Sequence, residues 1–303
     1  MNKKIEVFEV GPRDGFQSVK CTPPIATDLK LEVIDRIVAA GVRHMEYTSF
    51  VSPKAIPQLA DAKEVTQAVL SKYPGLDLFA LVPNLRGAQN AYELGLRRVC
   101  YVVSLSKSHN KANINRTHEQ SLEAYREIQA AYPDLDIILD LATAFGCPFE
   151  GKYEDTSAAV KFLKDYVEAG MTTCCLCETI GIADPRQVKE LIGELKAAYP
   201  DLALMVHFHD TRGLGMVNTI AAMESGVTCV QSALGGLGGC PFAPGASGNL
   251  STEDMIWMLN EMGYDTGVEF SKILEAAMFQ VEKIPGTYSG HHIHIETPTP
   301  CKY

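Results

Sequence analysis

Two histidines at the end of an apolar run are the first residues whose spacing suggests chemistry. His207 and His209 close the segment LALMVHFH, which begins at Leu202. Alternate side chains of a β-strand point to the same face of the sheet, so both imidazoles can face one side. Two imidazoles on one face form half of a divalent metal site. A purely structural role for the pair is the alternative interpretation.

A glycine-rich segment with a single thiol follows the next apolar run. Four of the five residues 235–239 are glycine, and Cys240 comes directly after them. A backbone of this kind can adopt conformations that are closed to other residues. We interpret it as a mobile loop whose thiol acts as an acid or a base once the loop closes and excludes water. An ordinary glycine-rich loop is the alternative.

Two oxygen donors complete a possible ligand set for the metal. Asp14 follows the first apolar run of the chain, and Asn249 follows the glycine-rich segment. With His207 and His209 they make two nitrogen and two oxygen ligands, a set that suits Mg²⁺ or Mn²⁺ with open positions for water or substrate. A thiolate-rich zinc site is disfavoured because only one cysteine belongs to this group.

Arg13, the neighbour of Asp14, would place a permanent cation beside such a metal. A guanidinium in this position can stabilise the oxygen of an enolate. An ion pair between Arg13 and a carboxylate, from Glu46 or Glu253, is the structural alternative and is compatible with that role.

The composition excludes several classes of protein. The 303 residues carry a net charge of −10, which argues against binding to nucleic acid or to an anionic membrane. The N-terminus has no signal-peptide segment, and no apolar run approaches the length of a membrane span. Nine cysteines without disulfide-framework spacing fit reduced thiols in a cytoplasmic protein. The CxxC at 174–177 lies in an apolar segment, so we expect core thiols there.

Short β-like runs alternate with amphipathic helical stretches along the chain. We expect strands at residues 5–10, 44–48, 76–81, 98–103, 137–142, 172–176, 204–207 and 227–232. Helical stretches such as 29–40, 155–169, 185–198 and 216–225 lie between them. Helix-ending glycines precede the next strands at Gly41, Gly95, Gly170 and Gly226. The pattern predicts a (β/α)₈ TIM barrel over about residues 5–250, with extra helices over about 251–303, in one catalytic domain of residues 1–303.

The residues with possible chemistry also fall where a barrel would place them. Active sites of TIM barrels lie at the C-terminal ends of the strands. Asp14 follows the first expected strand, Glu46 lies near the end of the second, and Glu178 follows the sixth. His207 ends the seventh strand, and Cys240 follows the eighth. The barrel prediction and the site prediction therefore support each other.

Several motifs resemble the 3-hydroxy-3-methylglutaryl-CoA lyase family, in order and with matching spacing from about residue 5 to about residue 268. They are GPRDGFQ (11–17), TSFVSPK (48–54), VPN (82–84), NIN (113–115), GCPFEG (146–151), HFHD (207–210), GGCP (238–241) and GASGNL (245–250). The GGCP and GCPFEG segments are specific to the lyase branch. The Arg-Asp-Gly and His-x-His pieces are shared with the wider metal-dependent acyl-transfer barrels, including isopropylmalate and homocitrate synthases.

The resemblance implies a retro-Claisen cleavage of a 3-hydroxyacyl-CoA into a ketoacid and acetyl-CoA. It implies a divalent metal held by Asp14, His207, His209 and Asn249. Arg13 matches the residue that stabilises the thioester enolate, and Cys240 matches the loop cysteine that exchanges a proton with acetyl-CoA. His207 is also a candidate for promoting loss of the hydroxyl proton.

Further positions are carried over by the same resemblance. Glu46 matches an acidic residue of the site, and Glu253 matches a residue that orients the arginine. Gln17 is a candidate for binding the substrate. The CoA arm would run along residues after the fourth strand, namely Ser104, Ser106, Lys107 and Asn113.

Three departures from the family pattern concern the substrate. Glu178 stands where the family has Asp, which moves a candidate catalytic carboxylate outward by about 1 Å. Ser18 and Val19 replace an amide and a carboxylate, which makes the mouth smaller and more apolar. Phe242 replaces a Tyr, a mild change. A 3-hydroxy-3-alkylglutaryl-CoA with a larger alkyl group is therefore a rival to the methyl substrate.

Two other functions stay open at this stage. The same barrel could condense acyl-CoA as a synthase, although the GGCP loop argues against it. It could also be a non-catalytic barrel that binds metal and CoA. We expect a homodimer by default, and leucine degradation is one pathway that a lyase of this kind would serve.

Overall fold

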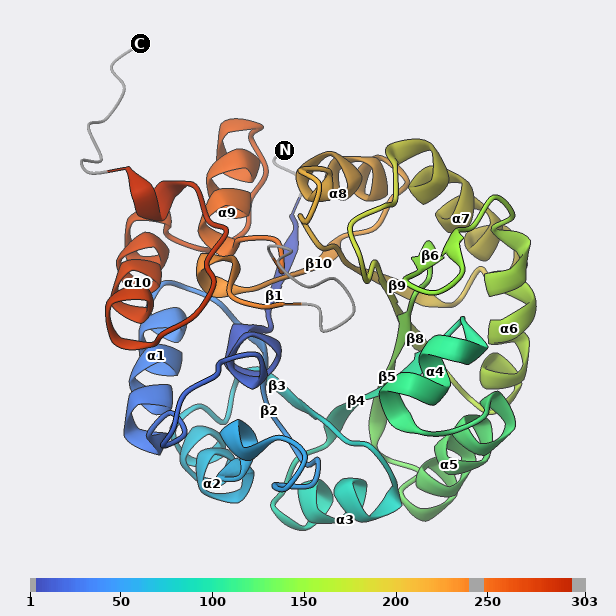
Figure 1. The fold of residues 1–303 in the computed structure, drawn as a ribbon, viewed down its shortest axis with the longest axis horizontal. Coiled ribbons are helices and arrows are strands. Elements are labelled where there is room, and N and C mark those ends of the chain that lie inside the picture. Colours follow the sequence, from blue (N-terminus) through green and yellow to red (C-terminus); the bar gives the residue numbers. More distant parts are fainter. Residues whose placement is uncertain (1–3, 240–247, 296–303) are drawn as a thin grey trace.

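The structure of the protein is a computed structural model, and it describes residues 4–239 and 248–295. Eight parallel strands close into a barrel in the order β1-β10-β9-β8-β5-β4-β3-β2, and the helices form a ring around them (Figure 1). The barrel strands are β1 (Glu6–Glu9), β2 (His44–Ser49), β3 (Asp77–Leu81), β4 (Arg98–Ser104), β5 (Asp136–Ala142), β8 (Thr173–Cys177), β9 (Ala203–His207) and β10 (Cys229–Ser232). Each lies within two residues of its predicted range, so the (β/α)₈ prediction is confirmed.

The helices follow the strands as the pattern predicts. They are α1 (Thr27–Ala39), α2 (Ala62–Lys72), α3 (Leu85–Glu93), α4 (Lys107–Ile114), α5 (His118–Ala131), α6 (Ser157–Glu168), α7 (Pro185–Ala198) and α8 (Gly215–Glu224). Gly41 and Gly170 have φ of 109° and 95°, the left-handed backbone that glycine supplies after a helix. These glycines thus end a helix shortly before the next strand begins.

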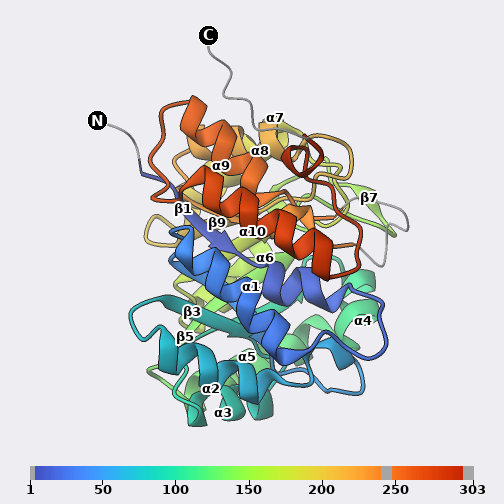
Figure 2. The same cartoon turned by 90° about the vertical axis from the view of Figure 1, so that its left-hand side faces the viewer.

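Extra helices follow the last strand, as predicted. They are α9 (Thr252–Glu261), α10 (Phe270–Lys283) and the short 3₁₀ turn η4 (His292–His294). Helix α10 packs against α1 and α9 (Figure 2). The histidine-rich tail folds back onto α9, where His291 and His292 bond to Asp254 through their backbone N–H groups and Nδ1 atoms. The exact division between barrel and helical extension stays a prediction.

Short turns and a hairpin lie at the C-terminal ends of the barrel strands. A π-helical turn, η1 (Gly11–Gly15), follows β1, and a 3₁₀ turn, η3 (Leu234–Gly236), follows β10. The GCPFEG motif forms a small antiparallel hairpin of β6 (Gly146–Cys147) and β7 (Gly151–Lys152). None of these turns was predicted, because each spans only a few residues and has no periodicity.

Two successive layers of side chains lie inside the barrel. The apolar layer consists of Phe8, Phe79, Cys100, Ile138, Cys175 and Met205. Two residues further along the strands lies the layer that we call the mouth layer, made of Leu81, Val102, Asp140, Cys177 and His207, with Gln231 paired to His207. Alternate positions such as Val99, Leu139 and Cys174 face the helices and join the main core.

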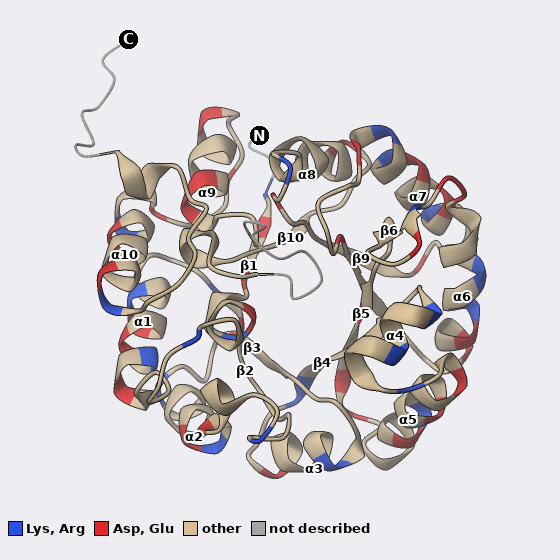
Figure 3. Ribbon diagram, in the orientation of Figure 1, with Lys and Arg blue, Asp and Glu red and all other residues tan. Residues whose placement is uncertain are grey.

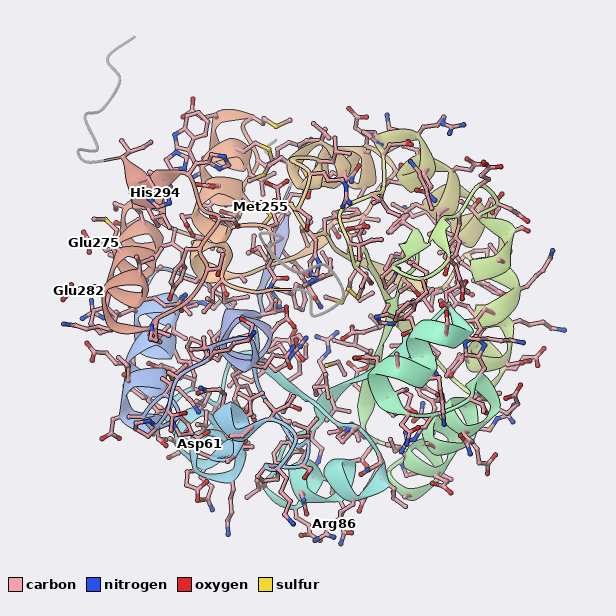
Figure 4. All side chains as sticks on the ribbon, viewed as in Figure 1. Asp61, Arg86, Met255, Glu275, Glu282 and His294 are labelled. Carbon is pink, nitrogen blue, oxygen red and sulfur yellow. The ribbon has the colours of Figure 1, made fainter. Side chains whose placement is uncertain are left out.

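The outer surface carries most of the charge. Lys, Arg, Asp and Glu are concentrated on the ring of helices rather than on the strands (Figure 3). Arg86 on α3 and Glu275 and Glu282 on α10 are exposed and lie at the outer rim (Figure 4). Within residues 4–239 and 248–295, no helix is both long and apolar enough to cross a membrane.

Candidate active site

A cavity of about 280 Å³ lies at the C-terminal ends of the strands. Its floor is the mouth layer. Its walls include Arg13, Asp14, Gln17, Val51, Ile56, His109, Asn113, Glu178, Thr179, His209 and Gly239. The residues predicted from the ends of the first, sixth and seventh strands therefore share one cavity.

Arg13 is fixed by two carboxylates. The π-helical turn η1 places it against β2, where Nε and Nη2 each donate to an oxygen of Glu46 at 2.7 Å. Nη1 donates to Oδ1 of Asp14, also at 2.7 Å. Glu46 is fully buried and Arg13 is 7% exposed. A bidentate, buried pair of this kind holds the guanidinium in one orientation, so Glu46 acts as the positioning partner of Arg13.

Asp14 and the two histidines converge on one point. One possible ligand atom from each of Asp14, His207 and His209 lies within 4.8 Å of the others. The two imidazole rings are 5.2 Å apart between centroids. His207 ends β9, and His209 pairs with Asn249 in an isolated antiparallel bridge. The bridge brings the fourth predicted ligand next to the other three.

The second ring nitrogen of each histidine is already bonded. Nδ1 of His207 lies 3.0 Å from Oε1 of Gln231, and Nδ1 of His209 lies 2.8 Å from the carbonyl oxygen of Thr179. Both acceptors call for a proton on Nδ1, which leaves Nε2 with its lone pair free. Partners of this kind fix the tautomer and the ring orientation of metal-binding histidines.

Asn249 tests whether these residues fit a metal. Its Nδ2 donates to Oδ2 of Asp14 at 2.7 Å and to the carbonyl of Leu237 at 3.1 Å. Its Oδ1 is buried and has no hydrogen-bond partner among the described residues. A buried oxygen without a partner is costly unless a ligand satisfies it. The donor set and this orphaned oxygen fit a divalent cation that prefers nitrogen and oxygen ligands.

The protonation states agree with that fit. Burial favours the neutral form of Asp14, but Arg13, His207 and the bond from Asn249 outweigh it and lower the pKa of Asp14 to about 2. Burial, together with His209, lowers the pKa of His207 to about 4. At neutral pH the site therefore offers a carboxylate and a neutral imidazole, the forms that bind metal.

Glu178 bonds to its own loop. Its carboxylate accepts the backbone N–H groups of Gly181 and of Ile182, the second at 3.0 Å, and a longer bond of 3.4 Å from Ile180. The side chain is 1% exposed and lines the cavity. The loop that Glu178 holds also presents the Thr179 carbonyl to His209.

Glu253 bonds to the turn η3, and the bonds of Arg13 in the described residues go to Glu46 and Asp14, so the orienting role that the resemblance implies for Glu253 stays a prediction. It belongs to the first turn of α9, and its Oε2 accepts the backbone N–H of Gly235 at 2.9 Å. Glu9 makes a similar contact, because its Oε1 accepts the N–H of Leu234 at 2.8 Å. Burial raises the pKa of both carboxyl groups to about 7. The two acids thus hold η3, at the base of the glycine-rich segment.

The predicted substrate-binding residues fall into two sets. Gln17 lines the cavity and donates from Nε2 to Oδ1 of Asp14 at 2.7 Å, and Asn113 lines the cavity from α4. Ser104 and Ser106 are buried behind the cavity wall, where Ser106 caps α4 through the N–H of His109. Lys107 is exposed at the start of α4. Their roles in CoA binding stay predictions.

The cysteine loop is described only at its ends. Cys240 and Phe242 lie outside the described residues. Gly239 lines the cavity, and Gly238 has φ of 157°. A Cβ on Gly238 would lie 2.6 Å from Nδ2 of Asn249. Only glycine therefore allows the segment that leads to Cys240 to pass this close to a predicted metal ligand.

Sequence reasoning missed several polar residues of the cavity, among them Asp140, Gln231 and His109. Asp140 and Gln231 lie in the floor, and His109 lies in the wall. The signal was present for the first two, since each is a lone polar side chain inside an apolar strand, in IILDLA and CVQS. His109 carries no such signal, because its position depends on how α4 packs over the barrel.

The chain is similar to proteins of one family along most of its length. Residues 4–279 match the model of the HMGL-like family. Hydroxymethylglutaryl-CoA lyase of Bacillus subtilis is 39% identical over 284 residues, which cover 93% of this chain and 94% of that protein. The human mitochondrial hydroxymethylglutaryl-CoA lyase is 39% identical over 279 residues, which cover 91% and 85%.

Solved structures give the same result. The HMG-CoA lyase of Bacillus subtilis superposes with a TM-score of 0.90 and 38% identity, covering 96% of this chain and 97% of that one. An HMG-CoA lyase from Acinetobacter baumannii, in complex with coenzyme A and 3-methylmalate, has a TM-score of 0.90 and 36% identity, with coverage of 98% and 96%.

Proposed function

The chain belongs to the HMGL-like family, and on that premise we propose that it is a divalent-metal-dependent carbon–carbon lyase of the hydroxymethylglutaryl-CoA lyase type. It cleaves 3-hydroxy-3-methylglutaryl-CoA, or a close 3-hydroxy-3-alkylglutaryl-CoA, to acetyl-CoA and a ketoacid. The relatives named hydroxymethylglutaryl-CoA lyase support this function, as does the relative that binds coenzyme A.

One observation carries the proposal beyond the family name. Asp14, His207, His209 and the orphaned oxygen of Asn249 converge beside Arg13, whose orientation is fixed by Glu46. A cleavage that leaves a thioester enolate needs a cation at the thioester oxygen and an electrophile at the hydroxyl-bearing end of the substrate. The cavity offers a place for both.

The metal would be held by Asp14, His207, His209 and Asn249. When bound, it supplies Lewis-acid polarisation of the substrate oxygens that it contacts. We propose Mg²⁺ or Mn²⁺, since the donor set has no thiolate.

The chain's own residues stabilise the negative charge that develops on the substrate. The hydroxyl at C3 would give its proton to water in the cavity, the C2–C3 bond breaks, C3 becomes the ketone, and the electron pair passes to C2 and the thioester oxygen. Arg13 lies in the cavity wall with a fixed guanidinium, so it can stabilise that enolate oxygen without reorganising. Cys240 would then deliver a proton to C2, a role that rests on the family resemblance.

His207 has two predicted roles that compete for one nitrogen. Its Nδ1 is bonded to Gln231, so Nε2 is the remaining lone pair. We therefore assign His207 to metal binding rather than to proton removal. Glu178 is also a poor proton acceptor as it stands, because its oxygens accept backbone N–H groups of the same loop. We propose that Glu178 positions the loop that carries Thr179.

Several finer points stay predictions. A homodimer is the default expectation for barrels of this kind, a cytoplasmic location is the expectation from the cysteine content, and leucine degradation is one pathway that the reaction would serve. The synthase alternative predicts condensation and no need for the Cys240 thiol. The non-catalytic alternative predicts tight binding of metal and acyl-CoA without turnover.

The test is release of acetyl-CoA from 3-hydroxy-3-methylglutaryl-CoA, measured before and after chelation of the metal. We expect release with Mg²⁺ or Mn²⁺, loss of release with a chelator, and recovery when the metal is added back. Cys240→Ser should remove most turnover while metal binding is unchanged. Release that survives complete metal removal would refute the proposal, and full activity of Cys240→Ser would favour the synthase.

A further inference from the structure

The cavity floor carries an acidic side chain for which the proposed reaction has no use. Asp140 lies in β5, two residues before Ala142 on the same face of the strand, and both line the cavity. The side chain of Asp140 is 4% exposed. Its neighbours in the floor, Val102 and Cys177, offer no strong hydrogen bond. A floor that only had to receive a methyl group would need no carboxyl group here.

Asp140 differs from Glu46, a second buried acid at this end of the barrel. Both oxygens of Glu46 accept from Arg13, and Oε1 also accepts from the Cys100 thiol at 2.9 Å. Oδ1 of Asp140 is buried and has no hydrogen-bond partner within the described part of the chain. Arg13 is already occupied by Glu46 and Asp14.

The surroundings of Asp140 define which partner it can take. Acidic or thiol atoms of Glu46 and Cys100 lie within 4.8 Å of its carboxyl group, and those of Cys175 and Cys177 form a second such cluster around it. Burial and the nearby Glu46 raise the pKa of Asp140, and this outweighs the opposite effects of Arg13 and of the Cys100 thiol. A buried oxygen without a partner is costly in either protonation state, so a substrate group that bonds to it would bind preferentially.

We propose that Asp140 is a specificity-determining residue, which hydrogen-bonds a hydroxyl group on the acyl part of the substrate. This inference rests on the proposed lyase function and names its substrate class, a 3-hydroxyacyl-CoA with a hydroxylated substituent where 3-hydroxy-3-methylglutaryl-CoA has its methyl group. A hydroxyl group can donate to a carboxylate and can also accept from a carboxylic acid. A methyl group can do neither, and the adjacent Arg13 disfavours an ammonium group.

The expected preference for a hydroxylated substrate follows from the unpaired oxygen of Asp140. An apolar substituent against Asp140 leaves a buried oxygen unsatisfied, whereas a hydroxyl group satisfies it. Sites that bond a substrate hydroxyl discriminate strongly against analogues that lack it. We expect kcat/KM for the hydroxymethyl thioester to exceed that for the methyl thioester by about 10- to 100-fold.

The experiment compares two thioesters, 3-hydroxy-3-methylglutaryl-CoA and 3-hydroxy-3-(hydroxymethyl)glutaryl-CoA, on the metal-loaded protein. Asp140→Leu, which is similar in shape but apolar, should reverse the preference in favour of the methyl compound. Asp140→Asn, whose amide oxygen still accepts a hydrogen bond, should keep the preference for the hydroxymethyl compound. Asp136→Leu is the matched control, because Asp136 lies at the opposite end of the same strand and pairs with Arg98. Its ratio of kcat/KM values should equal that of the wild type.

The outcomes separate this inference from the function on which it rests. Cleavage of both thioesters with a ratio that Asp140→Leu does not change would overturn the specificity role alone. If Asp140→Leu does not fold, Asp140→Ala takes its place. If the wild type cleaves neither thioester, the lyase proposal fails, and both compounds then serve as stable ligands for calorimetric titration. Tighter binding of the hydroxymethyl compound, lost in Asp140→Leu, would still support the inference, and equal Kd values would refute it.

Discussion

The two layers inside the barrel are built from the same strands but have different roles. The apolar layer, from Phe8 to Met205 in chain order, consists of aromatic, aliphatic and thiol side chains that contact one another. The mouth layer, only two residues further along the strands, includes Asp140, His207 and Gln231. A shift of two residues along each strand therefore separates a packed apolar core from a cavity with polar groups.

This difference explains how one barrel can combine stability with reactivity. Burial of apolar side chains contributes folding free energy in proportion to the area removed from water. Burial of polar groups costs free energy unless each is bonded. The apolar layer should therefore determine stability, and the mouth layer should determine activity. Substitutions in the two layers test this division directly.

The largest effect is expected from loss of a metal ligand at the mouth. His209→Ala removes a ligand whose ring is held by the Thr179 carbonyl. Activity should fall by more than the roughly 10- to 100-fold that loss of an outer-shell partner costs. The measurements are turnover and, by calorimetry, metal affinity. As a control, the thermal unfolding temperature of the metal-free protein should change little. Wild-type metal affinity in the variant would show that the site lies elsewhere.

The apolar layer should respond in the opposite way. Phe79 is fully buried in β3. Phe79→Ala should lower the free energy of unfolding by about 3–5 kcal/mol, because it removes apolar contacts and leaves a cavity. Denaturant unfolding measures this loss, and kcat/KM at a temperature where the variant is folded should stay close to the wild-type value. A large drop in kcat/KM in the folded variant would show that the two layers are not independent.

A buried acid outside the barrel interior sharpens the comparison with a smaller effect. The pKa of Glu9 is raised from 4.5 to about 7, mainly by burial. A carboxyl group whose pKa rises on folding contributes stability that is complete below pH 4.5 and is lost as the pH rises through 7. Glu9→Gln keeps an acceptor for Gly11 and Leu234 and cannot ionise. Between pH 4.5 and pH 8 the wild type should therefore lose up to about 3 kcal/mol relative to the variant.

Thermal unfolding of both proteins across this pH range measures the effect of Glu9. The ratio of their activities should vary much less with pH than the difference in stability, because Glu9 bonds to η3 and Thr252 and does not line the cavity. Parallel stability curves for the two proteins would mean that Glu9 keeps its ordinary pKa in the folded state.

Much of the fold was predictable because it depends on local patterns. Short apolar runs, helical periodicity and glycines such as Gly170 located every barrel strand within two residues. Four of the cavity residues, Arg13, Asp14, His207 and His209, were predicted from their type and spacing. The π-helical turn η1 was missed, although it sets the direction of Arg13, because a five-residue turn has no repeating signal.

The bonds within the site were less predictable. The sequence offered both Glu46 and Glu253 as partners for Arg13, and of these two the structure pairs Arg13 with Glu46. The sequence placed Glu178 among the catalytic candidates, and the structure directs its carboxylate to the N–H groups of its own loop. In both cases several donors compete for one carboxylate, and their distances depend on how the barrel closes.

The sequence by itself determined the barrel and the inventory of chemical groups at its mouth. Strand and helix periodicities are local, and the end of a barrel strand is a defined place. Tertiary structure decided which groups are paired and which are left open, as it did for Glu46 and Asp140. Pairing depends on side chains from strands far apart in the chain, and these meet only when the eight strands close around a common axis.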